Sequence, residues 1–343
     1  MWAQSSPSQL YFGIQPPYAP LPTGGECAQM LVGSNTWEPR PENARANTAI
    51  VDAGSLAAFH ANPLNFIDGA PAADFQRVDG NYSGTTDMII RWAACKWGMD
   101  ENVLRAEAYL ESNWGAYRVG DLQTNPYLCS AGMWLGWQPA GYCWDSFGIS
   151  QIKLMSFNAW PMAWTSTAFN LDLRGAYFRA CMNGDIGYYN FTPPSAGYPY
   201  YSTNDDLHTL EWGCVGAWFS GQWYDSAALN YIQYMENFVA EAPWRSWPSG
   251  SSASLQLNSP VDTQVVSGVT PISITLNQND PNACYACWSI DDLQQTCTPA
   301  TGPWYWDTTQ YTLNGTHAVS VDAYSCNGIA PNYHVGIDVT VAN

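Results

Sequence analysis

Charged side chains are scarce in this sequence of 343 residues. Asp, Glu, Lys and Arg make up 12% of the chain, and 11 Lys and Arg stand against 29 Asp and Glu, which gives a formal net charge of −18. A surface with this charge repels nucleic acid and anionic membranes. We therefore expect no nucleic acid as a partner, and any contact with an anionic wall polymer must depend on shape and ring stacking.

Long apolar runs and histidines are lacking as well. No stretch of about 18 apolar residues is present, so we expect no membrane span. The four histidines, His60, His208, His317 and His334, accompany no nucleophile motif, and the sequence contains no Gly-x-Ser-x-Gly, phosphate-loop or His-Glu-x-x-His pattern. We expect neither a metal nor a cofactor.

Cysteine and tryptophan, by contrast, are abundant. Six of the ten cysteines precede residue 250 and four follow it, so each half of the chain can pair internally. Cys284-x-x-Cys287 has the spacing of a zinc site, but no histidine lies at a matching distance, which favours disulfides. This pattern predicts a secreted, extracellular protein, with the disulfide connectivity left open.

Composition divides the chain into four segments. Residues 1–84 are rich in Pro, Gly, Ser and Asn and predict an irregular N-terminal arm, packed on the next domain and tied down by Cys27. Residues 85–246 alternate helical stripes with aromatic, Gly-rich loops. Residues 247–255 form a flexible linker, and residues 256–343 switch to a period of two. We expect a monomer with more than one domain.

The last segment predicts an all-β domain. Its strand runs are Val265–Val266, Ile272–Leu276, His317–Val321 and Val335–Val341. Short alternating strands separated by turn residues are typical of a β-sandwich. The stretch Leu313–Ala323 and the Val-rich strand after it resemble bacterial immunoglobulin-like domains, which implies an immunoglobulin-like sandwich over residues 256–343.

A carboxyl group of special interest lies at the end of a predicted helix. Thr85 can cap a helix that Gly98 ends, and Asp100 can cap the next helix, whose apolar face and C-terminal end include Glu111. Partial burial and the negative end of the helix dipole both raise the pKa of such a group. A general acid that protonates a glycosidic oxygen needs this property. Alternatively, Glu111 reaches solvent or pairs with a neighbouring arginine.

Several motifs around Glu111 resemble those of the lytic transglycosylases and goose-type lysozymes. The segments Tyr109–Trp114 and Phe147–Ile152 are similar to the Glu-Ser and Gly-Leu-Met-Gln-Ile signatures of that family. Ala168–Gly175 is similar to its Asn-containing helix start. Gly216–Gly221, followed by Asn230-Tyr231-Ile232, is similar to its Ala-Tyr-Asn-Ala-Gly motif and following helix. The ordered blocks span about residues 86–240, with Ser150 and Phe219-Ser220 as departures from the pattern.

The resemblance implies a mainly α (α+β) lysozyme-like catalytic domain that cleaves a polymer of N-acetylated amino sugars. Glu111 would lie on the floor of a cleft between helical lobes. Gln151, beside Ser150, would contact an acetamido group, and Tyr231 would approach the Glu111 carboxyl. The expected substrate is peptidoglycan, with chitin or chitosan as the alternative. A non-catalytic wall-binding protein on the same scaffold is a third hypothesis.

A second carboxylate is required only by some mechanisms of glycoside cleavage. Hydrolases use a base or a nucleophile in addition to the acid. Asp145, just before a strand expected at Gly148–Ile152, is the first candidate and Asp121 the second; either can instead be a turn-capping residue. Lytic transglycosylases need no such partner. Glu107, one turn before Glu111, is a rival for the role of acid and would raise the pKa of its neighbour.

Tryptophans concentrate in the Gly-rich loops of the predicted catalytic domain. The apolar faces of sugars stack on such rings. The loop tryptophans are Trp114, Trp134, Trp137, Trp144, Trp218 and Trp223. Among them, Trp114, Trp144 and Trp218 are the candidates for substrate contact, and core packing is the alternative for each.

Overall fold

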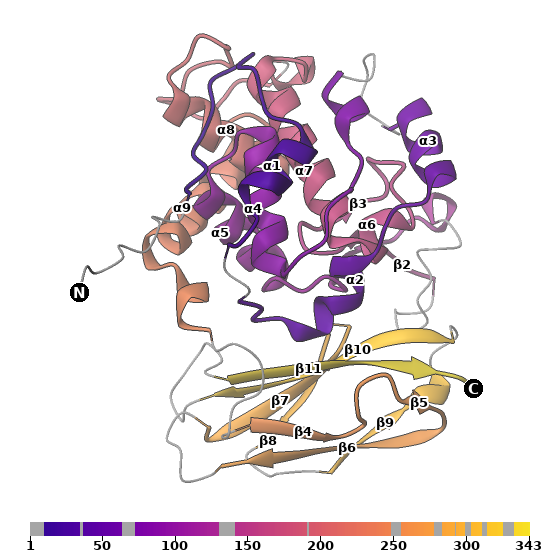
Figure 1. The fold of residues 1–343 in the computed structure, drawn as a ribbon. Helices are drawn as coiled ribbons and strands as arrows, with labels where there is room; N and C mark the ends of the chain where they lie inside the picture. The colour runs from indigo at the N-terminus through magenta and orange to yellow at the C-terminus, as the bar shows by residue number, and fades with distance from the viewer. Residues whose placement is uncertain are drawn as a thin grey trace, which may run out of the picture.

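The chain folds into a mainly helical part followed by a part built of strands (Figure 1). The computed structural model describes residues 10–34, 37–63, 73–129, 141–190, 192–247, 255–277, 283–291, 293–298, 303–310, 314–324 and 333–343. The protein is therefore a mixed α/β protein of more than one domain. The predicted linker lies almost wholly outside the described residues.

The first part contains helices of different lengths and one small sheet. The α-helices are α1 (Gly24–Met30), α2 (Ala44–Thr48), α3 (Ala53–Ala61), α4 (Thr86–Trp97), α5 (Glu101–Ser112), α6 (Met162–Thr165), α7 (Thr167–Asn183), α8 (Leu207–Ser220) and α9 (Ser226–Glu241). The 3₁₀ turns are η1 (Pro41–Asn43), η2 (Ala73–Arg77), η3 (Pro126–Leu128), η5 (Gly187–Asn190) and η6 (Pro243–Ser246). A small antiparallel sheet, ordered β1-β2-β3, consists of β1 (Val119–Gln123), β2 (Cys143–Phe147) and β3 (Ile152–Lys153).

Helices α4 and α5 confirm the predicted pair. The Thr85 side chain caps α4, and Gly98 ends it in a left-handed conformation with φ 61°. The Asp100 side chain accepts two backbone N–H groups of the first turn of α5, and Asn113 ends that helix with φ 54°. Each cap satisfies helix-end groups that would otherwise lack partners. Glu111 is thereby fixed in the last turn of α5.

The segment before α4 is part of the helical core. Cys27 of α1 is bonded to Cys95 of α4. The Phe12 backbone N–H donates to Glu101 at 3.2 Å, and the Arg179 guanidinium donates to the Pro16 carbonyl at 3.0 Å. The N-terminal arm thus packs on α4, α5 and α7, as predicted, but the prediction that it is irregular is wrong in part, because its described residues include α1, α2 and α3.

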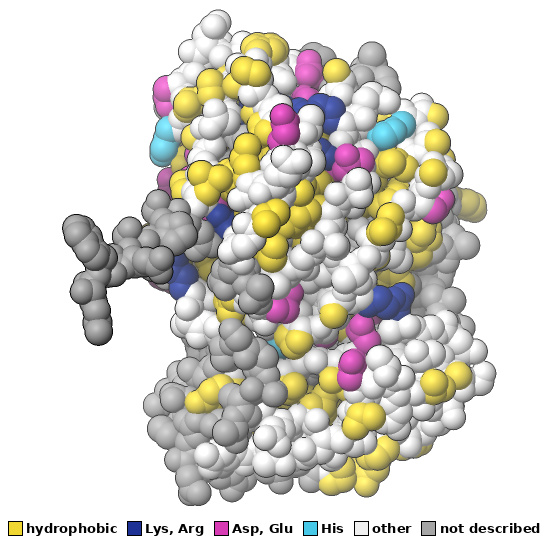
Figure 2. All heavy atoms as spheres, viewed as in Figure 1, with side chains coloured by type: hydrophobic (Ala, Val, Ile, Leu, Met, Phe, Trp, Pro, Cys, Tyr) yellow, Lys and Arg dark blue, Asp and Glu magenta, His cyan; other side chains and the backbone are white. Residues whose placement is uncertain are grey.

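Six of the eleven cationic side chains are buried: Arg40, Arg91, Lys96, Arg105, Arg174 and Arg179. Most of them pair with buried carboxylates, as Lys96 does with Asp172 at 2.8 Å. On the face shown in Figure 2, charged side chains are few and lie scattered among apolar and polar ones. Because buried charges need partners, the core takes up most of the few cations that this chain has.

Disulfides lie within each half of the chain, as predicted. Among the described residues they include Cys27–Cys95, Cys129–Cys143, Cys181–Cys214 and Cys287–Cys297. Cys287 is therefore a disulfide partner, which excludes the zinc interpretation of its motif. Disulfides of this number are typical of an oxidising, extracellular environment. Within the part of the chain that the structure describes, no helix combines the length and the apolar character needed to cross a bilayer.

The second part consists of two sheets around one apolar core. Its strands are β4 (Leu255–Ser259), β5 (Val265–Val266), β6 (Val269–Leu276), β7 (Tyr285–Ile290), β8 (Leu293–Thr298), β9 (Trp304–Asp307), β10 (Gly315–Tyr324) and β11 (Tyr333–Val341), with the turn η7 (Thr308–Gln310). One sheet has the order β5-β11-β10-β7-β8 and the other the order β4-β6-β9. The four predicted strand runs coincide with β5, β6, β10 and β11.

One predicted strand is wrong. Residues 148–151 form a tight turn between β2 and β3, and the strand begins only at Ile152. Gly148 and Gln151 both have left-handed backbones, with φ 76° and 52°, and extended strands exclude that conformation. The turn carries Gln151 to the side of the sheet at which the candidate site lies.

The two parts meet where β10 and β11 pack under η1 and α2 (Figure 1). His334 of β11 lies 2.8 Å from Glu42 and 2.6 Å from Asp322, one carboxylate at each ring nitrogen. Gly336 makes room for this contact, because a Cβ there would lie 2.3 Å from the Glu42 carboxylate. Burial acts to lower the pKa of His334, but the two carboxylates outweigh it and raise the pKa to about 9. His334 is therefore a buried imidazolium at neutral pH.

The His334 contact should make stability depend on pH. The pKa of His334 is raised from 6.5 to about 9 in the folded protein, so its contribution is complete below pH 6.5 and is lost as pH rises through about 9. We expect His334→Gln to lower the Tm by roughly 5 °C at pH 6 and by much less at pH 10. Calorimetry across this range checks the prediction. A deficit that stays constant with pH would contradict it.

Candidate active site

Glu111 lies where two hollows of the helical part meet. We call the first the sheet-side groove; it lies beside β1–β3 and has a volume of ≈ 770 Å³. Its lining residues are Glu111, Arg118, Val119, Gly120, Asp121, Ser146, Gln151, Lys153, Met155, Ser156, Phe157, Tyr177, Ala217, Trp218, Phe219, Ser220 and Gly221. The second, the helix-side pocket, has a volume of ≈ 420 Å³ and is lined by Leu110, Glu111, Phe219, Ala227, Asn230, Tyr231 and Tyr234. Ligand sites typically have such volumes.

Burial sets the protonation state of Glu111. It raises the pKa of the Glu111 carboxyl to about 8, and the nearby Glu107 carboxylate contributes in the same direction. The buried Tyr231 hydroxyl donates a hydrogen bond to Glu111 Oε1 and acts in the opposite direction, because it stabilises the ionised form. Glu111 is consequently protonated at pH 7, partly exposed to both hollows, and able to give up its proton there.

Glu107, the rival candidate, is already paired with a cation. Glu107 and Arg174 of α7 are both fully buried and form a two-point ion pair, in which Arg174 Nη2 donates to Glu107 Oε2 at 2.7 Å. The guanidinium of Arg174 also lies 4.6 Å from the Trp218 ring, which lines the sheet-side groove. The pair thus forms a layer beneath the groove, and its charges are already compensated.

Asp121 and Lys153 form a polar wall of the sheet-side groove. Their side chains are 3.0 Å apart, and the Ser146 hydroxyl donates to the same Asp121 oxygen at 2.9 Å. Partial burial acts to raise the pKa of Asp121, but Lys153 and Ser146 outweigh it and hold the pKa below its ordinary value. Asp121 is therefore ionised when Glu111 is protonated. Its backbone is left-handed, with φ 48°, and Asp121 itself has no partner among the β1–β2 pairs, although the register is the same on either side of it.

Gln151 lines the same groove, as the resemblance implied. Its amide nitrogen donates to the Gly148 carbonyl at 2.8 Å and to the Arg118 carbonyl at 3.2 Å. Its amide oxygen packs on Gly120, where a Cβ would lie at 2.3 Å. Only glycine leaves room for that approach. The Gln151 side chain is thereby locked across the turn.

Two predicted site residues do not reach either hollow. Asp145 is 3% exposed and accepts the Met155 backbone N–H at 2.9 Å. Its neighbour Ser146 lines the groove, and adjacent strand residues point to opposite faces of a sheet, so Asp145 faces away. Ser150 is fully buried in the turn, where its backbone N–H donates to Asn170 at 2.9 Å. Asp121, the second candidate, is the carboxylate that the groove offers.

The tryptophans divide between core and groove. Trp218 lines the sheet-side groove. Trp114 is fully buried, with its indole nitrogen donating to the Arg105 carbonyl at 2.9 Å, and Trp223 is 1% exposed. Trp144 packs partly buried on the core and lines neither hollow. Trp134 and Trp137 lie outside the described residues. The core-packing alternative therefore applies to Trp114, Trp144 and Trp223.

Two exposed aromatic rings beside Glu111 were not predicted as site residues. Phe219 is 55% exposed and Tyr234 is 60% exposed, and both line the helix-side pocket. Phe219 stacks on Tyr231, with ring centroids 4.8 Å apart and planes 8° apart. Tyr234 follows Tyr231 by three residues on α9, a spacing that places both on one face. That spacing was the available signal for Tyr234.

Another hollow lies away from Glu111 and offers no free acid. It has a volume of ≈ 460 Å³, and Asp87, Glu101 and Arg105 are among its lining residues. Arg105 pairs with Asp87 at 2.7 Å and with Glu101 at 2.8 Å. Both carboxylates are held by one guanidinium, whereas Glu111 accepts a hydrogen bond from the Tyr231 hydroxyl.

Removing the Tyr231 hydroxyl should raise the pKa of Glu111 further above about 8. A hydrogen bond to an ionised group contributes about 1.5 kcal/mol, so Tyr231→Phe should reduce the ionised fraction of Glu111 at a given pH roughly tenfold. Carboxyl-carbon NMR titration measures this without a substrate. Tyr234→Phe, a change in the same pocket, is the control that should leave the titration in place.

Removing the Glu107 charge should have the opposite effect on Glu111. In Glu107→Gln the buried Arg174 cation loses its partner, so we expect the pKa of Glu111 to fall and the fold to lose about 3–5 kcal/mol. Asp172→Asn breaks the buried pair with Lys96 and is the matched control for stability. Equal shifts of the Glu111 titration in both variants would refute a specific electrostatic effect of the pair.

No family model and no curated protein matches this chain. Parts of it match solved structures weakly. A fibronectin(III)-like module of Clostridium thermocellum CbhA is 20% identical, with a TM-score of 0.22 over 25% of this chain and 94% of that one. An endo-β-1,4-mannanase of Thermotoga petrophila is 11% identical, with a TM-score of 0.22 over 53% of this chain and 46% of that one. A Bacteroides uniformis β-glucuronidase is 10% identical, with a TM-score of 0.19 over 36% and 14%. These likenesses carry no functional argument, so the functional assignment depends on the geometry around Glu111.

Proposed function

We propose that this protein is a glycosidase that cleaves β-1,4 bonds of peptidoglycan, with Glu111 as its general acid and then its base. The observation that carries the proposal is a carboxyl group with a pKa of about 8 at the junction of two hollows. Glycoside cleavage requires a proton donor at the leaving oxygen, and a carboxylic acid of raised pKa supplies it near neutral pH. Glu111 is held by a phenol rather than by a cation, so its proton remains available.

The arrangement supports a cleavage step in which the glycosidic bond lies across Glu111. Sugar rings on one side would occupy the sheet-side groove, over Trp218, and rings on the other side the helix-side pocket, over Phe219 and Tyr234. Glu111 would protonate the bridging oxygen as the bond breaks. The resulting carboxylate, stabilised by the Tyr231 hydroxyl, would then accept the proton of the attacking water or sugar hydroxyl.

Hydrolysis and transglycosylation require different groups at the site. A hydrolase needs a second carboxylate to position water or to form a covalent intermediate, and Asp121, ionised and in the groove, is suited to that role. A lytic transglycosylase uses a hydroxyl and the acetamido group of its own substrate. In that route Asp121 would serve only to hold Lys153.

Charge in the groove favours peptidoglycan over chitosan. The net charge of −18 suits a cationic polymer such as chitosan. However, the groove is lined by Arg118 and Lys153, two of the few cations that lie outside the core, against one ionised carboxylate, that of Asp121. Such a lining repels the amino groups of chitosan and tolerates the carboxylates carried by peptidoglycan.

The same proposal covers the finer assignment of fold and location. Residues 85–246 would be a lysozyme-like catalytic domain, and residues 256–343 an immunoglobulin-like sandwich. The motifs around Glu111 and the two-sheet core of the second part support these assignments. Disulfides in both parts support secretion.

Glu111→Gln should abolish cleavage, with a loss of at least about 10³-fold in kcat, because the amide keeps the size of the side chain but supplies no proton. Turbidity clearing of purified peptidoglycan and of chitosan, with wild type and variant, measures it. Clearing of peptidoglycan alone supports the proposed substrate, and clearing of chitosan alone supports the alternative. Binding to walls without any clearing by the wild type would instead favour the non-catalytic hypothesis.

Asp121→Asn separates the two routes. If Asp121 acts as the base, the variant should lose at least about 10²-fold in kcat, and wild-type products should carry reducing ends. If the protein is a transglycosylase, the wild type should release anhydro-sugar ends and the variant should keep most of its activity. Mass spectrometry of the products decides between them.

A further inference from the structure

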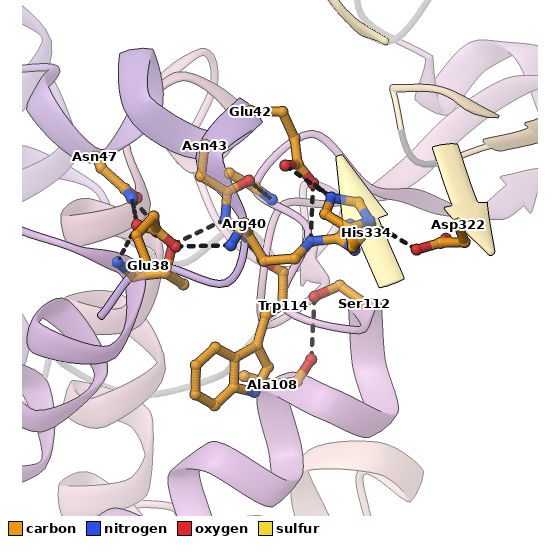
Figure 3. Close-up of polar contacts among 12 residues, drawn as sticks. Glu38, Arg40, Glu42, Asn43, Asn47, Ala108, Ser112, Trp114, Asp322 and His334 are labelled. Atoms are coloured by element: carbon orange, nitrogen blue, oxygen red, sulfur yellow. Dashed lines mark hydrogen bonds and ion pairs between the residues drawn. The ribbon is translucent and has the colours of Figure 1, made fainter. Parts of the chain in front are cut away.

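The strand domain contacts the turn η1, and η1 in turn holds the chain that follows α5, the helix that carries Glu111. Figure 3 shows His334 of β11 facing Glu42 of η1, while the next residue, Asn43, lies beside Trp114. His334 contacts Glu42 at 2.8 Å. The Asn43 amide nitrogen donates to the Trp114 carbonyl at 2.7 Å, and its oxygen accepts the Ala116 N–H at 2.9 Å. Two adjacent residues of η1 therefore connect the two parts of the protein.

The chain that Asn43 holds is strained. Asn113 and Trp114 have φ values of 54° and 62°, and Asp121 has 48°. A left-handed backbone is unfavourable for a bulky residue such as tryptophan and persists only where the surroundings impose it. The strain is greatest at Trp114, the bulkiest of these residues. Asn43 holds the chain there by two hydrogen bonds, one to the Trp114 carbonyl and one from the Ala116 N–H. Without the clamp, we expect the segment from residue 113 to residue 121 to relax.

Apolar packing reinforces the clamp from the same side. Ala116 and Tyr117 are 3% and 4% exposed and belong to one buried cluster with Ala46 of α2 and Ala318 of β10. The strand domain thus contacts the segment directly through Ala318 and indirectly through Glu42. Both contacts fall on residues 114–117, just after α5.

This segment leads straight into the groove. Arg118, Val119, Gly120 and Asp121 all line the sheet-side groove, within eight residues of the α5 C-cap at Asn113. A shift of the segment would move the Asp121 carboxylate and the Arg118 guanidinium relative to Glu111. Displacements on the order of 1 Å in an active site can reduce turnover about 10²-fold.

We propose that Glu42 and His334 are positioning residues: docking of the strand domain on η1 fixes, through Asn43, the segment 113–121 that forms one wall of the groove opposite Glu111. The strand domain then supports the groove through the contact at η1 rather than acting only as a spacer. The part of this inference that concerns turnover rests on the proposed function. The part that concerns the order of the segment does not.

Hydrogen exchange of the full chain, read by mass spectrometry, tests the second part. In His334→Ala we expect the amides of residues 114–118 to exchange at least about tenfold faster, although none of these residues is altered. Glu42→Gln is the second variant, because it keeps the size of the side chain and an accepting oxygen but removes the charge. It should give a smaller increase over the same residues.

Thr308→Val is the matched control. Thr308 is fully buried in the strand domain, and its hydroxyl bonds Gly268 and Asn343 at 2.9 Å, all within that domain. This variant should destabilise the strand domain while exchange of residues 114–118 stays at the wild-type rate. Exchange that rises equally in the control and in His334→Ala, or that stays unchanged in both His334→Ala and Glu42→Gln, would overturn the proposal.

Turnover provides the functional readout, measured on peptidoglycan well below the Tm of each variant. His334→Ala should lower kcat at least about tenfold, and Thr308→Val should leave it unchanged. An inactive wild type would refute the proposed function but leave the exchange test intact. Faster exchange in an active His334→Ala variant with unaltered kcat would show that the contact orders the segment without positioning the groove, and would refute the catalytic part.

Discussion

The ion pair between Glu107 and Arg174 determines what Glu111 can do. The two residues are fully buried side by side under the groove, and each satisfies the charge of the other. If Arg174 were instead free to pair with Glu111, the pKa of Glu111 would fall and the proton donor would be lost. With eleven cations against twenty-nine carboxylates, the chain cannot supply a partner for every acid. Glu111 is left with a phenol, and burial then keeps its proton in place at neutral pH.

The remaining buried pairs connect segments that are distant in sequence around this centre. Lys96 joins Asp172, which ties α4 to α7, the helix that supplies Arg174. Arg105 of α5 holds Asp87 of α4, and Glu101 of α5 accepts the Phe12 backbone N–H. Each pair is expensive to desolvate and is retained only with good geometry. Counting the Glu107–Arg174 pair, α5 is tied to α4, to α7 and to the N-terminal arm, so that the position of Glu111 follows from charge compensation as much as from apolar packing.

Local signals in the sequence were sufficient for α4, α5 and the raised pKa of Glu111, because caps and helix periodicity act over a few residues. The Glu107–Arg174 pair joins residues 67 positions apart, and no local pattern indicates it. The choice between Asp121 and Asp145 depended on strand register, which reverses the facing of a side chain with a shift of one residue. Asp121 escapes that alternation through its left-handed backbone. Trp114 looked like a loop residue but is fully buried, because Trp37, Trp244 and Trp247 from other segments pack around it.

The groove differs from the rest of the surface both in its charge and in the contacts that hold its walls in place. An acidic surface keeps anionic polymer away from most of the molecule, while Arg118 and Lys153 make the groove an exception. Both cations lie on elements that the Glu111 helix does not itself hold: Arg118 follows the strained turn, and Lys153 ends β3. Arg118 follows Ala116, which Asn43 holds from outside the groove, and Lys153 pairs with Asp121 within it. Because preorganised charge is effective only when its surroundings prevent relaxation, a wall built from a strained segment needs external support, and the docked strand domain provides it.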